Sequence, residues 1–348
     1  MEYRPLGKTD LKVSALSLGG AAFGQQFGPV SAAEAADTVH AAIDAGVNLV
    51  DTAAYYGRGL AEEFLGKALD GGRRDKVYVC TKACRLGDAD FDFTPAGTRA
   101  SVEASLKRLR TDYVDILLAH DIEFATDYEA VFTETSEVLH QLKKEGKARF
   151  VGMSCYPLPL LKQAIERCRL DVVISYAHYN LFNTKLETEL LPTAEAHGVG
   201  VLNASPLAMG LLTRHGPRPW FPGQPEVVAA CRQAVELCQS RGADIETLGM
   251  QFCFAQKRLA SVITGAPRTD ELSMNLRAMT TPMDERLLAD VRAGVVQLKD
   301  WSWPCGNWTR RRRSGSGWRR GRAYSSPGWR RIPRRRGPGC GPGTWSRA

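Results

Sequence analysis

Residues 48–57, NLVDTAAYYG, join a short apolar segment to an acid at its end and to a tyrosine five residues later. An acid at the end of a buried strand needs a cationic or hydrogen-bonding partner, because a desolvated carboxylate is unstable alone. Asp51 ends this segment, and the next two apolar segments, VYVCTK and VDILLAH, end in Lys82 and His120. Three consecutive strand-like segments with ionisable ends predict one shared site at one end of a barrel.

Working outward, eight short apolar segments alternate with amphipathic patterns of helical period. This alternation predicts an α/β protein with a parallel sheet, and eight units in about 290 residues predict a (β/α)8 TIM barrel. Residues 3–16, with polar GKTD between two apolar stretches, predict an N-terminal β-hairpin. A doubly wound sheet is the alternative, but no strand is followed by the Gly-x-Gly-x-x-Gly turn that dinucleotide binding requires there. The strands are expected at 16–20, 47–51, 76–82, 113–120, 149–154, 171–176, 198–205 and 261–266, and the helices at 31–45, 60–69, 94–110, 127–145, from 157, 186–197, 226–241 and 246–257.

The composition is that of a soluble globular protein, with 44% hydrophobic and 24% charged residues among 348. No run of about 18 apolar residues is present, and the polar N-terminus lacks the apolar centre of a signal peptide. We therefore expect a cytoplasmic protein with no membrane segment, as a monomer or weak homo-oligomer. The nine cysteines are scattered and odd in number, which favours reduced thiols. Cys80 and Cys84 alone are weak evidence for a metal, and none is expected.

The C-terminal segment differs sharply from the rest of the chain. Residues 301–348 hold thirteen of the 46 basic residues and no acid, so the remainder has 33 basic and 38 acidic groups, a net charge of −5. The barrel is accordingly predicted to span 1–304 and not to bind nucleic acid. Residues 305–348, rich in Arg, Gly, Pro and Trp, are predicted to be disordered. Binding to nucleic acid or a membrane surface and translation of a shifted reading frame both stay open for this tail.

Four side chains at the predicted strand ends suggest acid–base chemistry. A tyrosine hydroxyl has an ordinary pKa of ~10, and a nearby lysine ammonium would lower that pKa by favouring the phenolate. An aspartate would anchor the lysine, and a neutral imidazole would orient a carbonyl or hydroxyl oxygen. Asp51, Tyr56, Lys82 and His120 together therefore predict carbonyl reduction or alcohol oxidation. A buried salt bridge with structural tyrosine and histidine is the alternative for each residue alone.

The sequence resembles the aldo-keto reductase family over about residues 1–304. The resemblance rests on GVNLVDTAAYYG (46–57), Thr81-Lys82, YVDILLAH (113–120) and ASPLAMGL (204–211). It implies that Tyr56 donates or accepts the proton, that Lys82 and Asp51 tune it, and that His120 orients the substrate. The family's five-residue spacing from the aspartate selects Tyr56 over Tyr55. A nicotinamide cofactor is then implied to lie extended over the barrel mouth and to exchange hydride with the substrate carbon.

The same resemblance implies a set of cofactor-binding residues, with some departures. Cys155 stands where the family has Asn, Tyr176 where it commonly has Gln, and Ala204 where many members stack a Tyr on the nicotinamide. Glu271 replaces the basic residue that binds the 2′-phosphate of NADP in relatives, which favours NAD and leaves NADP as the alternative. The implied cofactor residues are Gly20, Ala21, Asp51, Ser154, Tyr176, Ser205, Pro206, Leu207, Met209, Gly210, Leu211, Gly265, Arg268, Glu271 and Asn275.

Further segments narrow the resemblance to a sugar-oxidising branch of the family, that of L-galactose dehydrogenase and the D-arabinose (L-fucose) 1-dehydrogenases. They are HDIEF (120–124), SYAHYN (175–180), SPLAMGLLT (205–213), HGPRPWFP (215–222) and a final WP (303–304). This branch implies NAD-dependent oxidation of an aldose at C1 to a lactone, with Tyr56, His120 and Trp220 against the sugar. An NADP-dependent reductase of small aldehydes or ketones is one alternative. A redox-sensing binding subunit with the same fold is another.

Overall fold

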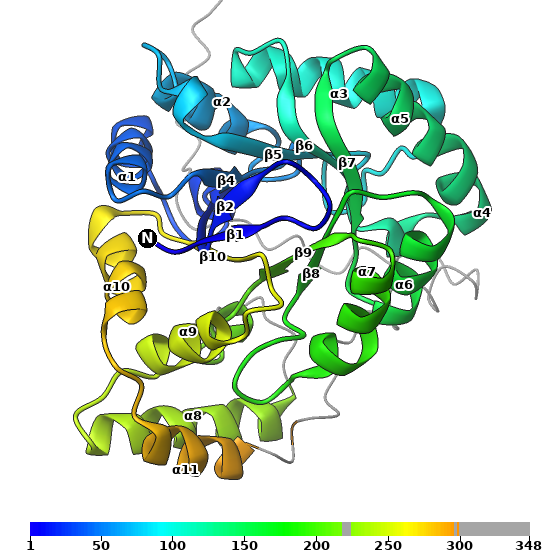
Figure 1. Ribbon diagram of the computed structural model, residues 1–348. Coiled ribbons are helices and arrows are strands. Elements are labelled where there is room, and N and C mark those ends of the chain that lie inside the picture. Colours follow the sequence, from blue (N-terminus) through cyan, green and yellow to red (C-terminus); the bar gives the residue numbers. More distant parts are fainter. Residues whose placement is uncertain (218–223, 296–297, 299–348) are drawn as a thin grey trace, which may run out of the picture. The chain divides into compact units, whose positions relative to one another are not determined.

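The computed structural model describes residues 1–217, 224–295 and Leu298, and its centre is a closed barrel of eight parallel strands (Figure 1). The strands follow one another around the barrel in chain order, and β10 closes it by pairing with both β9 and β3. Each of the eight predicted segments overlaps one strand, which confirms the (β/α)8 fold. The barrel strands are β3 (Leu16–Gly19), β4 (Leu49–Asp51), β5 (Tyr78–Ala83), β6 (Val114–Ala119), β7 (Ala148–Ser154), β8 (Val172–Tyr176), β9 (Gly200–Ala204) and β10 (Ser261–Gly265).

Helices surround the barrel, mostly where the sequence predicts them. Ser31 and Glu34 form the capping box at the start of the first helix. The expected helices over 127–145 and 186–197 each contain a π-helical turn, at Val131–Thr135 and Leu186–Leu190. Sequence analysis missed the two helices after β10, at Thr269–Thr280 and Glu285–Val295. The helices are α1 (Ala32–Asp44), α2 (Leu60–Ala68), α3 (Pro95–Leu109), α4 (Tyr128–Ala130), α5 (Ser136–Lys144), α6 (Leu158–Arg167), α7 (Leu191–Ala196), α8 (Pro225–Ser240), α9 (Ile245–Ala255), α10 (Thr269–Thr280) and α11 (Glu285–Val295).

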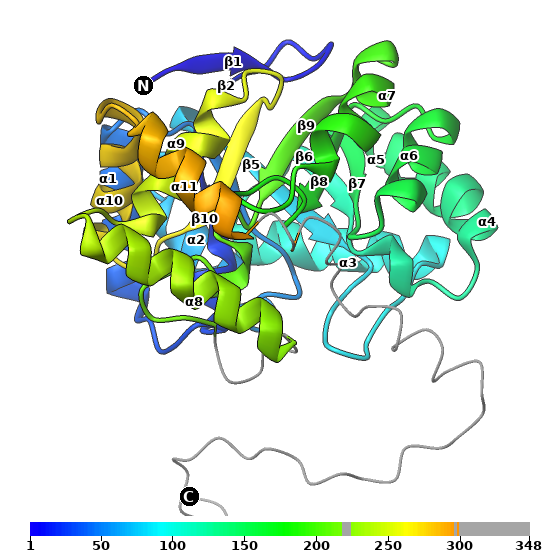
Figure 2. The same ribbon diagram turned by 90° about the horizontal axis from the view of Figure 1, so that it is seen from below.

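The predicted N-terminal hairpin, β1 (Tyr3–Pro5) and β2 (Lys12–Ser14), lies across the end of the barrel where the strands begin (Figure 2). Its turn packs tightly on the start of β9. A Cβ on Gly7, which has φ +55°, would lie 2.3 Å from the backbone nitrogen of Gly200. Leu6 and Val13 enter the apolar cluster inside the barrel. We call this closed end the base and the opposite end, where the strands finish, the mouth.

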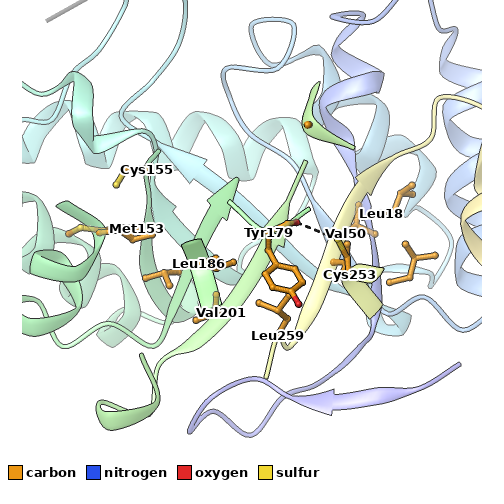
Figure 3. Close-up of a cluster of buried hydrophobic side chains, with 14 of the residues drawn as sticks. Leu18, Val50, Met153, Cys155, Tyr179, Leu186, Val201, Cys253 and Leu259 are labelled. Atoms are coloured by element: carbon orange, nitrogen blue, oxygen red, sulfur yellow. Dashed lines mark hydrogen bonds between the residues drawn. The ribbon is translucent and has the colours of Figure 1, made fainter. Parts of the chain in front are cut away.

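Two apolar clusters hold the fold together. The smaller one fills the barrel interior, and the larger one lies between the strands and the helices. Figure 3 shows part of the larger cluster, in which the thiol of Cys253 donates to the backbone carbonyl of Tyr179 at 3.3 Å. The seven described cysteines are all buried free thiols, as the odd count of nine suggests. Within the described ranges, no helix has both the length and the apolar character to cross a membrane.

Two predictions fall outside the described residues. One is the division at residue 304 with a disordered tail at 305–348, and the other is Trp220 as a substrate contact. Both stay predictions.

Candidate active site

The period-two alternation of the strands carries the functional side chains to the mouth. Leu49, Cys80 and Leu118 belong to the apolar cluster inside the barrel. Two residues after each of them in the chain come Asp51, Lys82 and His120. Because side chains at i and i+2 lie on the same face of a strand, all three point inward, above the apolar interior. The sequence pattern of apolar segments with ionisable ends therefore becomes one site.

Lys82 and Asp51 form a buried ion pair between adjacent strands. The Nζ atom of Lys82 lies 2.7 Å from both carboxylate oxygens of Asp51 and also donates to the backbone carbonyl of Thr52 at 2.8 Å. Lys82 is 2% exposed and Asp51 is 4% exposed. The negative charge of Asp51 raises the pKa of Lys82 despite its burial, so the lysine stays protonated.

Tyr56 reaches this ion pair from the loop after β4. Backbone contact between Gly24 and this loop sets its position, since a Cβ on Gly24 would lie 2.5 Å from the backbone carbonyl carbon of Tyr56. The hydroxyl of Tyr56 lies 3.2 Å from Lys82 Nζ. The neighbouring Tyr55 instead donates to Asp88 at 2.9 Å. Between the two tyrosines, the geometry joins Tyr56 to the lysine, as the motif spacing predicts.

The pKa of Tyr56 differs from the expectation based on the lysine alone. Lys82 does act to lower it, but burial of the hydroxyl outweighs the lysine and raises the pKa of Tyr56 to about 12. The sequence-based expectation that the lysine lowers this pKa therefore holds for the lysine's own effect but does not describe the net pKa. It considered the cation and left out the desolvation of the phenolate, which depends on packing.

His120 completes the group at the end of β6. Its ring stands edge-on to the Tyr56 ring, with centroids 5.8 Å apart and an interplanar angle of 89°. Burial and the charges of Lys82 and Arg85 hold the pKa of His120 well below its usual value, so the imidazole is neutral at neutral pH. Its Nδ1 atom is buried and has no hydrogen-bond partner among the described residues. Such an atom is suited to a substrate oxygen.

Sequence analysis missed a second layer of charged residues beside His120. Asp121 accepts a hydrogen bond from Arg85, and Glu123 accepts from the backbone of Tyr156 at 3.1 Å and from the hydroxyl of Tyr176 at 3.0 Å. Burial raises the pKa of Asp121 against the opposing charge of Arg85, and it raises that of Glu123 to about 8. The signal was present in HDIEF, which places two acids within three residues of a strand end.

The residues implied for the cofactor lie at the mouth, at or just after the ends of β3, β7, β8, β9 and β10. Gly20 and Ala21 follow β3, Ser154 ends β7 and Tyr176 ends β8. The loop 205–211 follows β9 and has positive φ at Ser205, Met209 and Gly210 among others. Gly265 ends β10, and the remaining three belong to the start and first turns of α10: Arg268, Glu271 and Asn275.

These residues fit a nicotinamide dinucleotide. At one end of the mouth His120 has an unpartnered buried nitrogen, and at the other α10 begins without a side-chain cap. An uncapped helix N-terminus favours a phosphate, because its backbone N–H groups point outward. Gly20 lets the end of β3 pack closely on the end of β4, since a Cβ there would lie 2.8 Å from the carbonyl oxygen of Asp51. Among the described residues, no cluster of His, Cys, Asp or Glu is suited to a metal ion.

Comparison with known proteins agrees with this geometry. Residues 15–294 match the Aldo/keto reductase family. L-galactose dehydrogenase from Arabidopsis thaliana is 41% identical over 315 residues, covering 88% of this chain and 98% of that protein. D-arabinose 1-dehydrogenase from Saccharomyces cerevisiae is 32% identical over 281 residues, covering 76% and 82%. The holo structure of aldo-keto reductase AKR11C1 from Bacillus halodurans superimposes with a TM-score of 0.71 at 28% identity, covering 87% of this chain and 97% of that one. This chain belongs to the aldo/keto reductase family of oxidoreductases.

Proposed function

We propose that this protein oxidises an aldose of the L-galactose, D-arabinose or L-fucose type at C1 to the aldonolactone, with NAD as hydride acceptor. Family membership makes the protein an oxidoreductase that uses a nicotinamide cofactor on a small-molecule substrate. The observation that carries the proposal is the contact of the Tyr56 hydroxyl with the buried Lys82–Asp51 pair, at 3.2 Å from the ammonium and beside a neutral His120.

In the proposed reaction Tyr56 takes the proton from the C1 hydroxyl of the sugar. Lys82, at 3.2 Å, stabilises the phenolate form that accepts the proton. Asp51 holds the ammonium through both carboxylate oxygens and keeps it charged in a buried site. The bound nicotinamide supplies the acceptor carbon for the hydride that leaves C1. Because burial raises the pKa of Tyr56 to about 12, the resting hydroxyl is protonated, and it releases this proton to solvent before the phenolate accepts the proton from C1.

His120 holds the reacting oxygen in this scheme. A neutral imidazole makes a hydrogen bond to that oxygen without adding a charge that would compete with the proton on Tyr56. The two rings are in edge-on contact at a centroid distance of 5.8 Å, which places the imidazole directly beside the tyrosine that handles the proton. Burial excludes water from the same position, because His120 is 4% exposed and Lys82 is 2% exposed.

Two features support NAD over NADP. Arg268, at the start of α10, is paired with Glu34 at 3.1 Å, and that pairing competes with binding of an added phosphate. Asp270 and Glu271 lie in the first turn of the same helix. Acids near that position repel the 2′-phosphate of NADP and accept hydrogen bonds from the free ribose hydroxyls of NAD. The relatives named for L-galactose and D-arabinose support an aldose as substrate.

A panel of aldoses with NAD and NADP tests the proposal, with absorbance of the reduced cofactor as the readout. We expect turnover with L-galactose, D-arabinose or L-fucose, a lactone product detected by hydroxylamine trapping, and kcat/KM at least about tenfold higher with NAD than with NADP. Reduction of simple aldehydes with NADPH, without oxidation of any of the three sugars, would contradict it.

Glu271→Gln tests the cofactor part separately. Removing this acid is expected to raise kcat/KM for NADP by about three- to tenfold while kcat/KM for NAD changes less, since one repulsive charge near a phosphate is worth on the order of 1 kcal/mol. Glu285→Gln, at the first turn of α11, is the matched control and should leave the ratio of the two cofactors unchanged.

A further inference from the structure

An arginine–aspartate pair stands beside the four proposed catalytic groups and has no role in the proton transfer. Arg85 lies three residues beyond Lys82, and Asp121 directly follows His120. The Nη1 atom of Arg85 donates to the Oδ2 atom of Asp121. The guanidinium also lies over the Tyr55 ring, at 3.7 Å from its centroid, which fixes its plane.

Two buried polar atoms in this corner lack partners within the described part of the chain. They are Nε of Arg85 and Nδ1 of His120. A buried polar atom without a hydrogen bond is unfavourable, and native structures keep few of them. Two such atoms on residues that adjoin the reacting centre indicate a place for polar groups of a ligand. One of them is a donor with a fixed direction, because the guanidinium is held by Asp121 and Tyr55.

The backbone turns Asp121 back toward the histidine. Its φ of 50° and ψ of 58° lie in the left-handed region, which a residue other than glycine adopts only at a cost. The result is a carboxylate oxygen 3.6 Å from Nε2 of His120. Asp121 thus lies at the Nε2 edge of His120, and its charge also acts on the Tyr56 hydroxyl. A sugar whose reacting oxygen meets Tyr56 would bring its next hydroxyl toward this carboxylate.

We propose that the Arg85–Asp121 pair recognises a hydroxyl group on the carbon next to the reacting carbon. Asp121 accepts the hydrogen bond from this hydroxyl, and Nε of Arg85 donates to its oxygen. The site thereby selects aldoses and 2-hydroxyaldehydes over their 2-deoxy counterparts. For sugars the inference rests on the proposed aldose oxidation. For short aldehydes it requires only that the site at the barrel mouth reduces a carbonyl group.

Two matched substrate pairs test the inference. The first compares L-galactose with 2-deoxy-L-galactose in oxidation with NAD, and the second compares lactaldehyde with propanal in reduction with NADH. The wild-type protein is expected to prefer the hydroxylated member by about 10- to 100-fold in kcat/KM, the range for a hydrogen bond to a charged group. Asp121→Ala should lower kcat/KM for that member by the same factor and leave the deoxy member within about threefold.

Arg85→Met is the second variant, because it keeps an apolar chain on the Tyr55 ring and leaves Asp121 in place. It should also reduce the preference for the hydroxylated member, and it decides the question alone if Asp121→Ala does not fold. Arg99→Met is the matched control. It removes an exposed arginine–carboxylate pair with Glu145 on the outer surface and should change neither ratio. Circular dichroism and cofactor fluorescence titration check folding of each variant.

The outcomes separate the inference from the proposed function. If the wild type oxidises L-galactose and 2-deoxy-L-galactose equally well, the inference is overturned and the proposed function stands. If no sugar is oxidised but lactaldehyde is preferred over propanal through Asp121, the inference stands and the proposed function fails. If the two variants lose kcat/KM equally on the hydroxylated and the deoxy member of each pair, the substitutions act on His120 in general. That result would overturn the inference.

Discussion

The base and the mouth of the barrel both bury charged side chains, but they satisfy them differently. At the base all three guanidinium nitrogens of Arg4 have acceptors, including the carbonyls of Phe254, Gln256 and Leu259. Asp115 likewise has partners on both carboxylate oxygens. At the mouth, several buried polar atoms have no partner among the described residues, including Thr52 Oγ1, Arg85 Nε, His120 Nδ1 and Glu123 Oε2.

The two ends use the same kinds of residue, but they differ in how many buried polar atoms lack a hydrogen-bond partner. The base is not perfectly satisfied, because Nε of Arg74 also lacks a partner. Even so, the charged side chains at the base form hydrogen bonds with backbone groups and ion pairs with one another. These interactions hold the hairpin and the strands together. The charges at the mouth gather around Tyr56, where we propose that the substrate binds. This division matches barrels in which one end provides stability and the other provides catalysis.

Tyr56→Phe should give the largest effect on turnover with the least effect on stability, which distinguishes the mouth from the base. Loss of the hydroxyl is expected to lower kcat by about 10²- to 10⁴-fold, because it removes the acid–base group. The free energy of unfolding should change by no more than about 1 kcal/mol, the value of one hydrogen bond. Steady-state kinetics, urea unfolding and fluorescence titration with the cofactor measure the three quantities.

Tyr78→Phe is the control for that experiment, since Tyr78 begins β5 at the base, on the same strand as Lys82. It should leave kcat within about twofold. If Tyr56→Phe keeps normal turnover, the proton donor is a different group and the mouth does not work as proposed.

Arg4→Met tests the base by the opposite pattern. Two buried carbonyls and one partly buried carbonyl lose their donor, so the free energy of unfolding is expected to fall by about 2–4 kcal/mol. Turnover at a temperature where the variant stays folded should remain within about twofold. Arg258→Met, which removes an exposed pair with Glu195, is the matched control and should cost no more than about 1 kcal/mol. A loss of turnover in Arg4→Met that is larger than its loss of stability would break the division between the two ends.

Glu123→Gln is expected to have the smallest effect, and it shows what a buried acid at the mouth does to stability. Burial raises the pKa of Glu123 from its ordinary 4.5 to about 8, so the folded protein keeps a proton that the unfolded chain releases. Stability contributed by this group is therefore present below about pH 4.5 and is lost as the pH rises toward 8. Between pH 5.5 and pH 8.5 the wild type should lose more unfolding free energy than Glu123→Gln, by on the order of 1–3 kcal/mol. Melting temperatures of both proteins at the two pH values measure this difference. Parallel pH curves for the two proteins would rule out a raised pKa.

Much of the fold and the centre of the site could be predicted from local patterns. Apolar segments of four to eight residues between turn signals predicted all eight barrel strands. The ionisable residues at the ends of three of them predicted the cluster that contains Asp51, Lys82 and His120. Tyr56 followed from its spacing after Asp51. These inferences worked because side-chain alternation along a strand is a property of the backbone itself.

Other features depended on contacts between residues distant in the sequence. The helices α10 and α11 were missed, although their residues alternate in burial as helices do. The pairing of Arg85 with Asp121 joins the ends of two different strands, and neither residue indicates the other in the sequence. The net rise in the pKa of Tyr56 comes from its burial, which outweighs the neighbouring lysine.

By itself, therefore, the sequence determined the order of the strands and which ionisable residues meet at the end of the barrel where we propose the proton transfer. Only the tertiary structure decided how deeply those residues are desolvated and which polar atoms among them remain without partners. The physical reason is range: strand alternation and motif spacing act over a few neighbouring residues, whereas burial and hydrogen-bond satisfaction depend on the packing of the whole barrel.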